Sequence, residues 1–199
     1  MVRSSFEPGR IVRITLVVVS VAGLGGAPLV LAGAAWAEAA VAPERNPPGD
    51  IPDSQVFVTY ANSAGYTLKV PEGWARSEAG PDVQFADKYD TVSVTLQDQG
   101  SPLSREMARK VFVPALEQTG RAVQVAGVEE VALPAGPAIR IRYSANSAPN
   151  PVTGKQVRLE ANRYLLFRAG KLATLDLSAP YGADNVDQWR LMAQSFRWK

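Results

Sequence analysis

The sequence predicts an α+β fold in which α-helices pack against an antiparallel β-sheet. Segments with strand periodicity follow one another across short turns, and such turns favour hairpins over crossovers. The clearest strand covers residues 65–71, where Tyr66, Leu68 and Val70 alternate with polar residues. Pro71 cannot donate a hydrogen bond to a neighbouring strand and ends this one, and Trp74 follows as a large apolar residue. We expect Trp74 to cap one end of the core.

Eight strands are expected in all, at residues 56–60, 65–71, 83–86, 91–97, 123–133, 138–144, 156–168 and 172–178. The first two pair as a hairpin across residues 61–64, and the last two form a long hairpin at Gly170. Ile139 and Ile141 alternate with Arg140 and Arg142, which fits a sheet that is wet on one side.

Two helices are expected, at residues 101–118 and 184–196. In the first, an apolar stripe is predicted to run through Met107, Val111 and Ala115, with Phe112 and Leu116 beside it. Pro114 removes one helical hydrogen bond, so a bend or break is expected there. In the second, Asp184 is the predicted N-cap.

Composition excludes several kinds of chemistry. The chain has 199 residues with no Cys and no His, which removes disulfides, thiol nucleophiles, Cys/His zinc sites and histidine acid–base catalysis. Of its 21 basic and 19 acidic residues, three basic and one acidic precede Glu38, which leaves 18 of each and a net charge of zero. Nucleic acid is therefore not an expected partner. We expect neither a cofactor nor enzymatic activity.

The N-terminus resembles an export signal. Arg3, Arg10 and Arg13 precede an apolar run from residue 14 to about residue 34, and Ala35 and Ala37 are small residues suited to a cleavage site. We predict a signal peptide over residues 1–37, with an uncleaved membrane anchor as the alternative. In both cases the folded part is extracytoplasmic: secreted, periplasmic or attached to the cell envelope.

Residues 38–54 are rich in Ala and Pro and are predicted to be an extended linker. The folded domain is expected over residues 55–199, as a single unit with one core.

The strand motifs of this domain resemble those of the PsbP-like family, which groups extrinsic photosystem II subunits with exported bacterial relatives. The resemblance rests on residues 56–60, 65–74, 83–87, 92–96 and 196–198. It implies an α/β sandwich that serves as an accessory, assembly or binding protein without known enzymatic activity. The metal-binding histidines of photosynthetic members have no counterpart here, so neither a manganese nor a zinc site is expected.

A protein partner is the expected ligand. Arg140, Arg142, Arg158 and Arg168 have the same strand parity and could form a cationic stripe, with Glu160 neutralising part of it. The loop over residues 146–154, with Asn150 between two prolines, could extend this contact surface.

The predicted function is therefore that of an exported, non-catalytic accessory protein that engages a protein partner at the outer face of the cytoplasmic membrane. The alternative is a carrier of a small apolar ligand. Its pocket would lie between the sheet and the helix that bears Met107, Val111 and Phe112.

Overall fold

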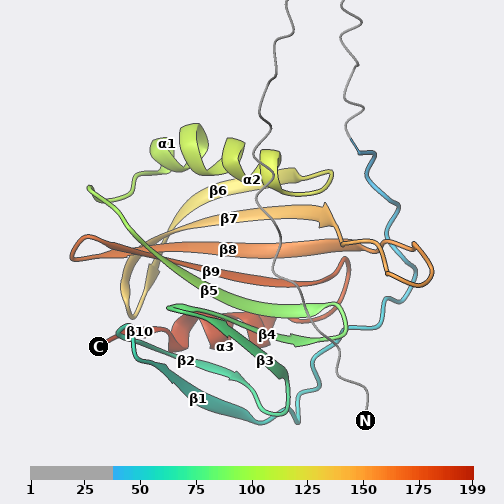
Figure 1. Cartoon of the computed structure of the whole chain (residues 1–199), viewed down its shortest axis with the longest axis horizontal. Coiled ribbons are helices and arrows are strands. Elements are labelled where there is room, and N and C mark those ends of the chain that lie inside the picture. The colour runs from blue at the N-terminus through green and yellow to red at the C-terminus, as the bar shows by residue number, and fades with distance from the viewer. Residues whose placement is uncertain (1–37) are drawn as a thin grey trace, which may run out of the picture. The chain divides into compact units, whose positions relative to one another are not determined.

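The computed structural model describes residues 38–199, in which the strands form two antiparallel sheets (Figure 1). The larger sheet has seven strands in the order β3-β4-β5-β9-β8-β7-β6. They are β3 (Ala75–Ala79), β4 (Asp82–Asp87), β5 (Asp90–Asp98), β6 (Gln124–Leu133), β7 (Gly136–Asn146), β8 (Arg158–Arg168) and β9 (Lys171–Pro180). The smaller sheet, in the order β1-β2-β10, contains β1 (Phe57–Asn62), β2 (Tyr66–Pro71) and β10 (Arg197–Trp198). The predicted α+β class, with antiparallel pairing and packed helices, is confirmed.

All eight expected strands are present, and the two that were missed lack a sequence signal. Strand β3 is exposed along its whole length, and its sequence has no large apolar residue to alternate with polar ones. Strand β10 is only two residues long, and its Trp198 pairs with Tyr66 of β2. The division into two sheets also was not anticipated, because it depends on which strands pair.

The first helical segment changes its hydrogen bonding in the middle. It consists of α1 (Arg105–Met107), a π-helical turn η1 (Ala108–Phe112) and α2 (Val113–Thr119). The N–H of Val113 donates to the carbonyl of Ala108, five residues back, directly before Pro114. The helical run continues through Pro114 to Thr119, so the expected break is absent and a π-helical turn precedes the proline instead. Of the predicted apolar face, Leu116 and Phe112 pack into the core together with Ala108, whereas Val111 is 56% exposed.

Helices cover both faces of the larger sheet, so the prediction of a sheet wet on one side was wrong. On β8, Leu165 belongs to the core beneath α1 and α2. Its neighbours Tyr164 and Leu166 point the other way, into a second core with the smaller sheet and α3 (Val186–Ser195). Trp74 is half-buried against this second core. Asn185, not Asp184, is the N-cap residue of α3.

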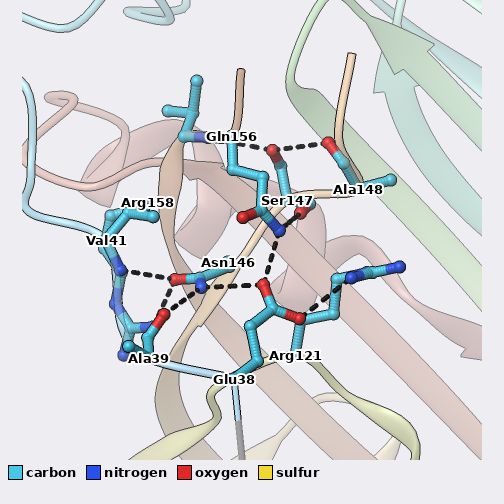
Figure 2. Close-up of polar contacts among 10 residues, drawn as sticks. Glu38, Ala39, Val41, Arg121, Asn146, Ser147, Ala148, Gln156 and Arg158 are labelled. Carbon is cyan, nitrogen blue, oxygen red and sulfur yellow. Dashed lines mark hydrogen bonds and ion pairs between the residues drawn. The ribbon is translucent and has the colours of Figure 1, made fainter. Parts of the chain in front are cut away.

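Residues 38–54 contain no helix or strand, but they pack against the domain and are not a free linker. Ile51 is buried, and its N–H donates to Oδ1 of Asn185 at 2.7 Å. At the other end, Asn146 binds this segment through the N–H of Val41 and the carbonyl of Ala39 (Figure 2). Packed structure therefore begins well before Gln55. The predicted signal peptide, residues 1–37, lies outside the described residues.

Among the described residues, no helix combines the length and the apolar character that are needed to cross a membrane.

Candidate functional site

The candidate site is a groove that forms because α3 covers only part of its face of the larger sheet. The floor of the groove comes from β6, β7 and β8, and its wall comes from α3 and the connection that precedes α3. It has a volume of about 640 Å³. Residues that shape it include Glu129, Arg140 and Arg142 on the floor and Tyr181, Val186 and Trp189 on the wall.

Arg140 and Arg142 meet at one carboxylate in this groove. The register of β6 and β7 places Arg140 directly opposite Glu129. Oε1 of Glu129 lies 3.0 Å from Nη2 of Arg140 and 3.1 Å from Nε of Arg142. Two of the four arginines predicted to bind a partner are thus side by side on an accessible surface.

Arg140 keeps its positive charge in this setting. Desolvation by burial lowers the pKa of Arg140, but interactions with Tyr164 and Glu129 outweigh it, so the pKa lies above its ordinary value. Glu129 accepts hydrogen bonds from the guanidinium groups of both arginines. The groove therefore contains two guanidinium groups that share one carboxylate, with Glu160 as a second carboxylate nearby.

The wall of the groove is apolar and partly uncovered. Val186, in the first turn of α3, is 62% exposed, and Tyr181 is 45% exposed. Trp189 is buried beneath them. Glu160 also lines the groove, where its Oε1 accepts a hydrogen bond from the N–H of Gly182 at 2.7 Å. Large apolar side chains exposed beside charged ones are a common composition of protein-binding surfaces.

Arg158 lies on the same face of the sheet but does not belong to an accessible stripe. It is only 3% exposed, and its guanidinium donates to Oδ1 of Asn146 at 3.0 Å and to Oγ of Ser144 at 2.6 Å. Desolvation by burial lowers the pKa of Arg158. Asn146 in turn holds Glu38, whose carboxylate also contacts Arg121 (Figure 2). Arg158 therefore contacts Asn146, which binds the N-terminal segment, and strand alternation alone could not show this.

Arg168 and Asn150 lie outside the groove. Arg168 is exposed at the far end of β8, ten residues from Arg158, or about 33 Å along an extended strand. Asn150 stabilises its own loop, because its Oδ1 accepts hydrogen bonds from the N–H groups of Val152 and Thr153 at 2.9 and 3.0 Å. The loop itself projects from the end of β7 and exposes Val152.

A half-buried ion pair on the opposite face was missed in the sequence. Arg163 and Asp176 are cross-strand partners in the hairpin of β8 and β9, and their side chains form a salt bridge. The hydroxyl of Tyr143 donates to Oδ2 of Asp176 at 2.9 Å. Burial raises the pKa of Asp176 above its ordinary value, although Arg163 acts in the opposite direction. Counting outward from the turn at Gly170 would have placed the two charges opposite each other.

A second, more apolar pocket of about 360 Å³ lies at the start of the first helical segment. Leu103, Ile139, Leu165 and Phe167 line it, together with Ser104. The sequence placed an apolar pocket beside Met107, Val111 and Phe112, one to two turns further along the helix. The observed pocket is therefore at a different position from the predicted one.

The residues that the structure describes include no cluster of three or more acidic side chains that could hold a metal ion.

These sheets and helices form a PsbP-like α/β sandwich. The solution structure of cyanobacterial PsbP (CyanoP) from Synechocystis sp. PCC 6803 is similar, with a TM-score of 0.54 and 18% sequence identity over 76% of this chain and 98% of that chain. A crystal structure from Bacteroides thetaiotaomicron VPI-5482 has a TM-score of 0.44 and 10% identity over 70% of this chain and 47% of that one.

No protein-family model matches this sequence, and no curated protein sequence matches it. At 18% identity the similarity to CyanoP concerns the fold alone. Because one fold supports many functions, the function has to be argued from the groove.

Proposed function

We propose that this chain is an exported, non-catalytic accessory protein that binds a protein partner at the outer face of the cytoplasmic membrane. The observation that carries this proposal is the groove, where Arg140 and Arg142 converge beside the exposed side chains of Val186 and Tyr181. Arginine and aromatic residues are enriched where protein interfaces gain most of their binding energy.

The ionisable groups of the groove support binding rather than catalysis. Glu129 accepts hydrogen bonds from two guanidinium groups, and Glu160 accepts one from a backbone N–H. A general acid or base has to exchange a proton with its substrate, whereas both of these carboxylates are already engaged within the protein.

The membrane-proximal part of the proposal rests on the sequence. The three arginines and the apolar run of residues 1–37 are features of a segment that directs export or anchors a chain. The balance of 18 basic and 18 acidic residues from Glu38 onward supports a protein partner over nucleic acid.

Site-specific photo-crosslinking in the host cell tests the proposal. A benzoylphenylalanine placed at Val186 reports on the groove, and one placed at Val152, which is 90% exposed, reports on the loop that contains Asn150. We expect the same protein to be captured repeatedly from position 186. Capture from position 152 alone would move the contact surface to the loop, and capture from neither position would contradict the proposal.

The second pocket supports an alternative function as a carrier of a small apolar ligand. Leu103, Ile139, Leu165 and Phe167 give it an apolar lining, and Ser104 could orient a polar group of the ligand. Native mass spectrometry of the full chain purified from its host tests this alternative. A small molecule that stays bound to the wild type and is lost from an Ile139→Asp variant of unchanged fold would favour the carrier.

A further inference from the structure

The guanidinium group of Arg142 has hydrogen-bond donors that the described residues do not use, although its Nε is bound to Glu129. Arg142 has five N–H donors, but within residues 38–199 its only hydrogen bond is from Nε to Oε1 of Glu129. All of the bonds from Arg140 and Arg142 to Glu129 go to that same oxygen. The Nη groups of Arg142 therefore remain free to bind a second carboxylate.

Gly127 determines where this guanidinium lies. The register between β6 and β7 shifts between Val125 and Gly127, which places Gly127 opposite Arg142. A Cβ atom added to Gly127 would lie 3.2 Å from Nη2 of Arg142 and 3.8 Å from its Cζ and Nε. The guanidinium thus lies close to Gly127, and a side chain at this position would require it to shift by a few tenths of an ångström.

The apolar wall faces the same groove. Val186 and Tyr181 are both exposed there, beside the buried ring of Trp189. A ligand whose carboxylate reaches Arg142 could therefore place a neighbouring apolar side chain against Val186 and Tyr181. The groove offers complementary surface to both groups.

We propose that the groove recognises an acidic side chain next to a large apolar one in an extended segment of the partner protein, and that Glu129 occupies part of this site in the free protein. This inference rests on the proposed function and names the feature of the partner that is recognised. We infer an acidic occupant from charge complementarity. The free donors of Arg142 suit a carboxylate of the partner. The groove's own carboxylates are already engaged: Glu129 with Arg140 and Arg142, and Glu160 with the N–H of Gly182.

Four variants separate this inference from a simple surface effect. Arg142→Gln removes the free donors and should weaken binding at least tenfold. Gly127→Ala should weaken it at least threefold, because the guanidinium must move while the exposed end of a flexible side chain absorbs the strain. Glu129→Gln should strengthen it at least threefold, because it removes a competing negative charge but keeps one acceptor for the arginines. Val186→Ser should weaken it by removing apolar contact.

The test uses a random 12-residue peptide library displayed on phage and selected on the immobilised full chain. We expect enrichment of peptides in which Asp or Glu adjoins Phe, Leu, Ile or Trp. Synthetic versions with Asn or Gln in place of the acid should then bind at least tenfold more weakly. Binding would be measured by fluorescence anisotropy for the wild type and the four variants.

Selection without acidic enrichment, failure to select any peptide, or equal binding of the acid and amide versions would overturn the inference. Weaker binding by Glu129→Gln would overturn the part assigned to Glu129. The proposed function is tested separately by photo-crosslinking, because it predicts that a partner is captured from position 186 whatever the sequence of that partner. If capture occurs but the acidic requirement is absent, only the further inference fails.

Discussion

Asn185 donates a hydrogen bond from Nδ2 to Oδ1 of Asp90 over 3.3 Å. The same amide group donates to the carbonyl of Gly49 at 2.8 Å, and its Oδ1 accepts from the N–H of Ile51 at 2.7 Å. One side chain at the start of α3 therefore joins β5 to the N-terminal segment. Because Asp90 is only 5% exposed, its charge state bears on how firmly that segment is held.

Stability should fall as pH rises through neutrality because of Asp90. Burial raises the pKa of Asp90 from 3.8 to about 7, with further contributions from the charges of Asp87 and Asp50, while Asn185 and Lys88 act against the shift. The folded state then binds the proton more tightly than the unfolded state. The contribution of Asp90 to the free energy of unfolding is therefore highest below about pH 4, decreases between about pH 4 and 7, and levels off above that range.

Asp90→Asn should remove this dependence and stabilise the protein at pH 8 by roughly 1–3 kcal/mol, because a neutral amide replaces a buried charge. Urea unfolding at pH 5 and pH 8 measures the difference. Asp98→Asn, which changes an exposed aspartate on the same strand, should leave the pH dependence as it is in the wild type. An Asp90→Asn variant with the pH dependence of the wild type would show that Asp90 is not the responsible group.

Asn185→Ala should loosen the N-terminal segment. It leaves the N–H of Ile51 and the carbonyl of Gly49 without their partner, a loss of roughly 1–3 kcal/mol. Hydrogen exchange at Ile51 should accelerate at least tenfold. Gln188→Ala is the matched control. It removes the 3.1 Å hydrogen bond that Nε2 of Gln188 donates to the carbonyl of Ile51, but it leaves the N–H of Ile51 bound to Asn185. Equal exchange in both variants would contradict the role given to Asn185.

The same substitution should have very different effects on stability at the two arginines at the ends of β8. Arg158→Leu removes the donor of several acceptors, including the carbonyl of Ala122 and Oγ of Ser144, and should cost roughly 2–4 kcal/mol. Arg168→Leu changes an exposed residue and should alter stability by less than about 0.5 kcal/mol. Denaturant midpoints measure both. A small effect at Arg158 would return it to the set of possible contact residues.

The half-buried pair of Arg163 and Asp176 should be more sensitive to loss of one member than to loss of both. Asp176→Leu leaves Arg163 unpaired and should cost roughly 2–4 kcal/mol, less than for a fully buried pair because both side chains keep some contact with water. The double variant Arg163→Leu with Asp176→Leu should recover much of this loss, because no charge remains there without a partner. A double variant as unstable as Asp176→Leu would argue against the ion pair.

Sequence periodicity predicted most of the fold because most strands have one face in a core. Tyr66, Leu68 and Val70 alternate with exposed or half-buried residues, and the register of β2 follows from them. Strand β3 escaped prediction because it has no buried side chain. The predicted helix face was partly misplaced because a regular α-helical pattern was assumed. The π-helical turn at Ala108–Phe112 changes which residues face the core, and the sequence pattern does not reveal such a turn.

The site was predictable only in part. Alternation with Ile139 and Ile141 correctly placed Arg140 and Arg142 on one face of the sheet. The same rule placed Arg158 with them, but strand alternation does not show what covers a side chain, and Arg158 is buried among hydrogen-bond partners that include Asn146. The wall of the groove could not be anticipated, since it depends on where α3 crosses the sheet. The pairing of Glu129 with Arg140 could have been predicted from the sequence, because the two residues lie opposite each other across the turn at residues 134–137.

Neutralising the two groove arginines tests the central claim most directly. Arg140→Gln with Arg142→Gln removes two positive charges from the groove, and Arg109→Gln with Arg168→Gln removes two exposed charges elsewhere. Both double variants should keep their thermal stability within about 1 kcal/mol of the wild type. Crosslinking from benzoylphenylalanine at Val186 in the host cell then compares partner capture among them.

We expect the groove variant to lose at least nine-tenths of the captured partner and the control variant to retain it. Wild-type capture in cell lysates should also decline as salt is raised, since exposed charges are screened beyond about 8–10 Å at physiological ionic strength. Equal capture by the wild type and the Arg140→Gln, Arg142→Gln variant would contradict the account, and the apolar pocket at Leu103 and Ile139 would then become the leading candidate site.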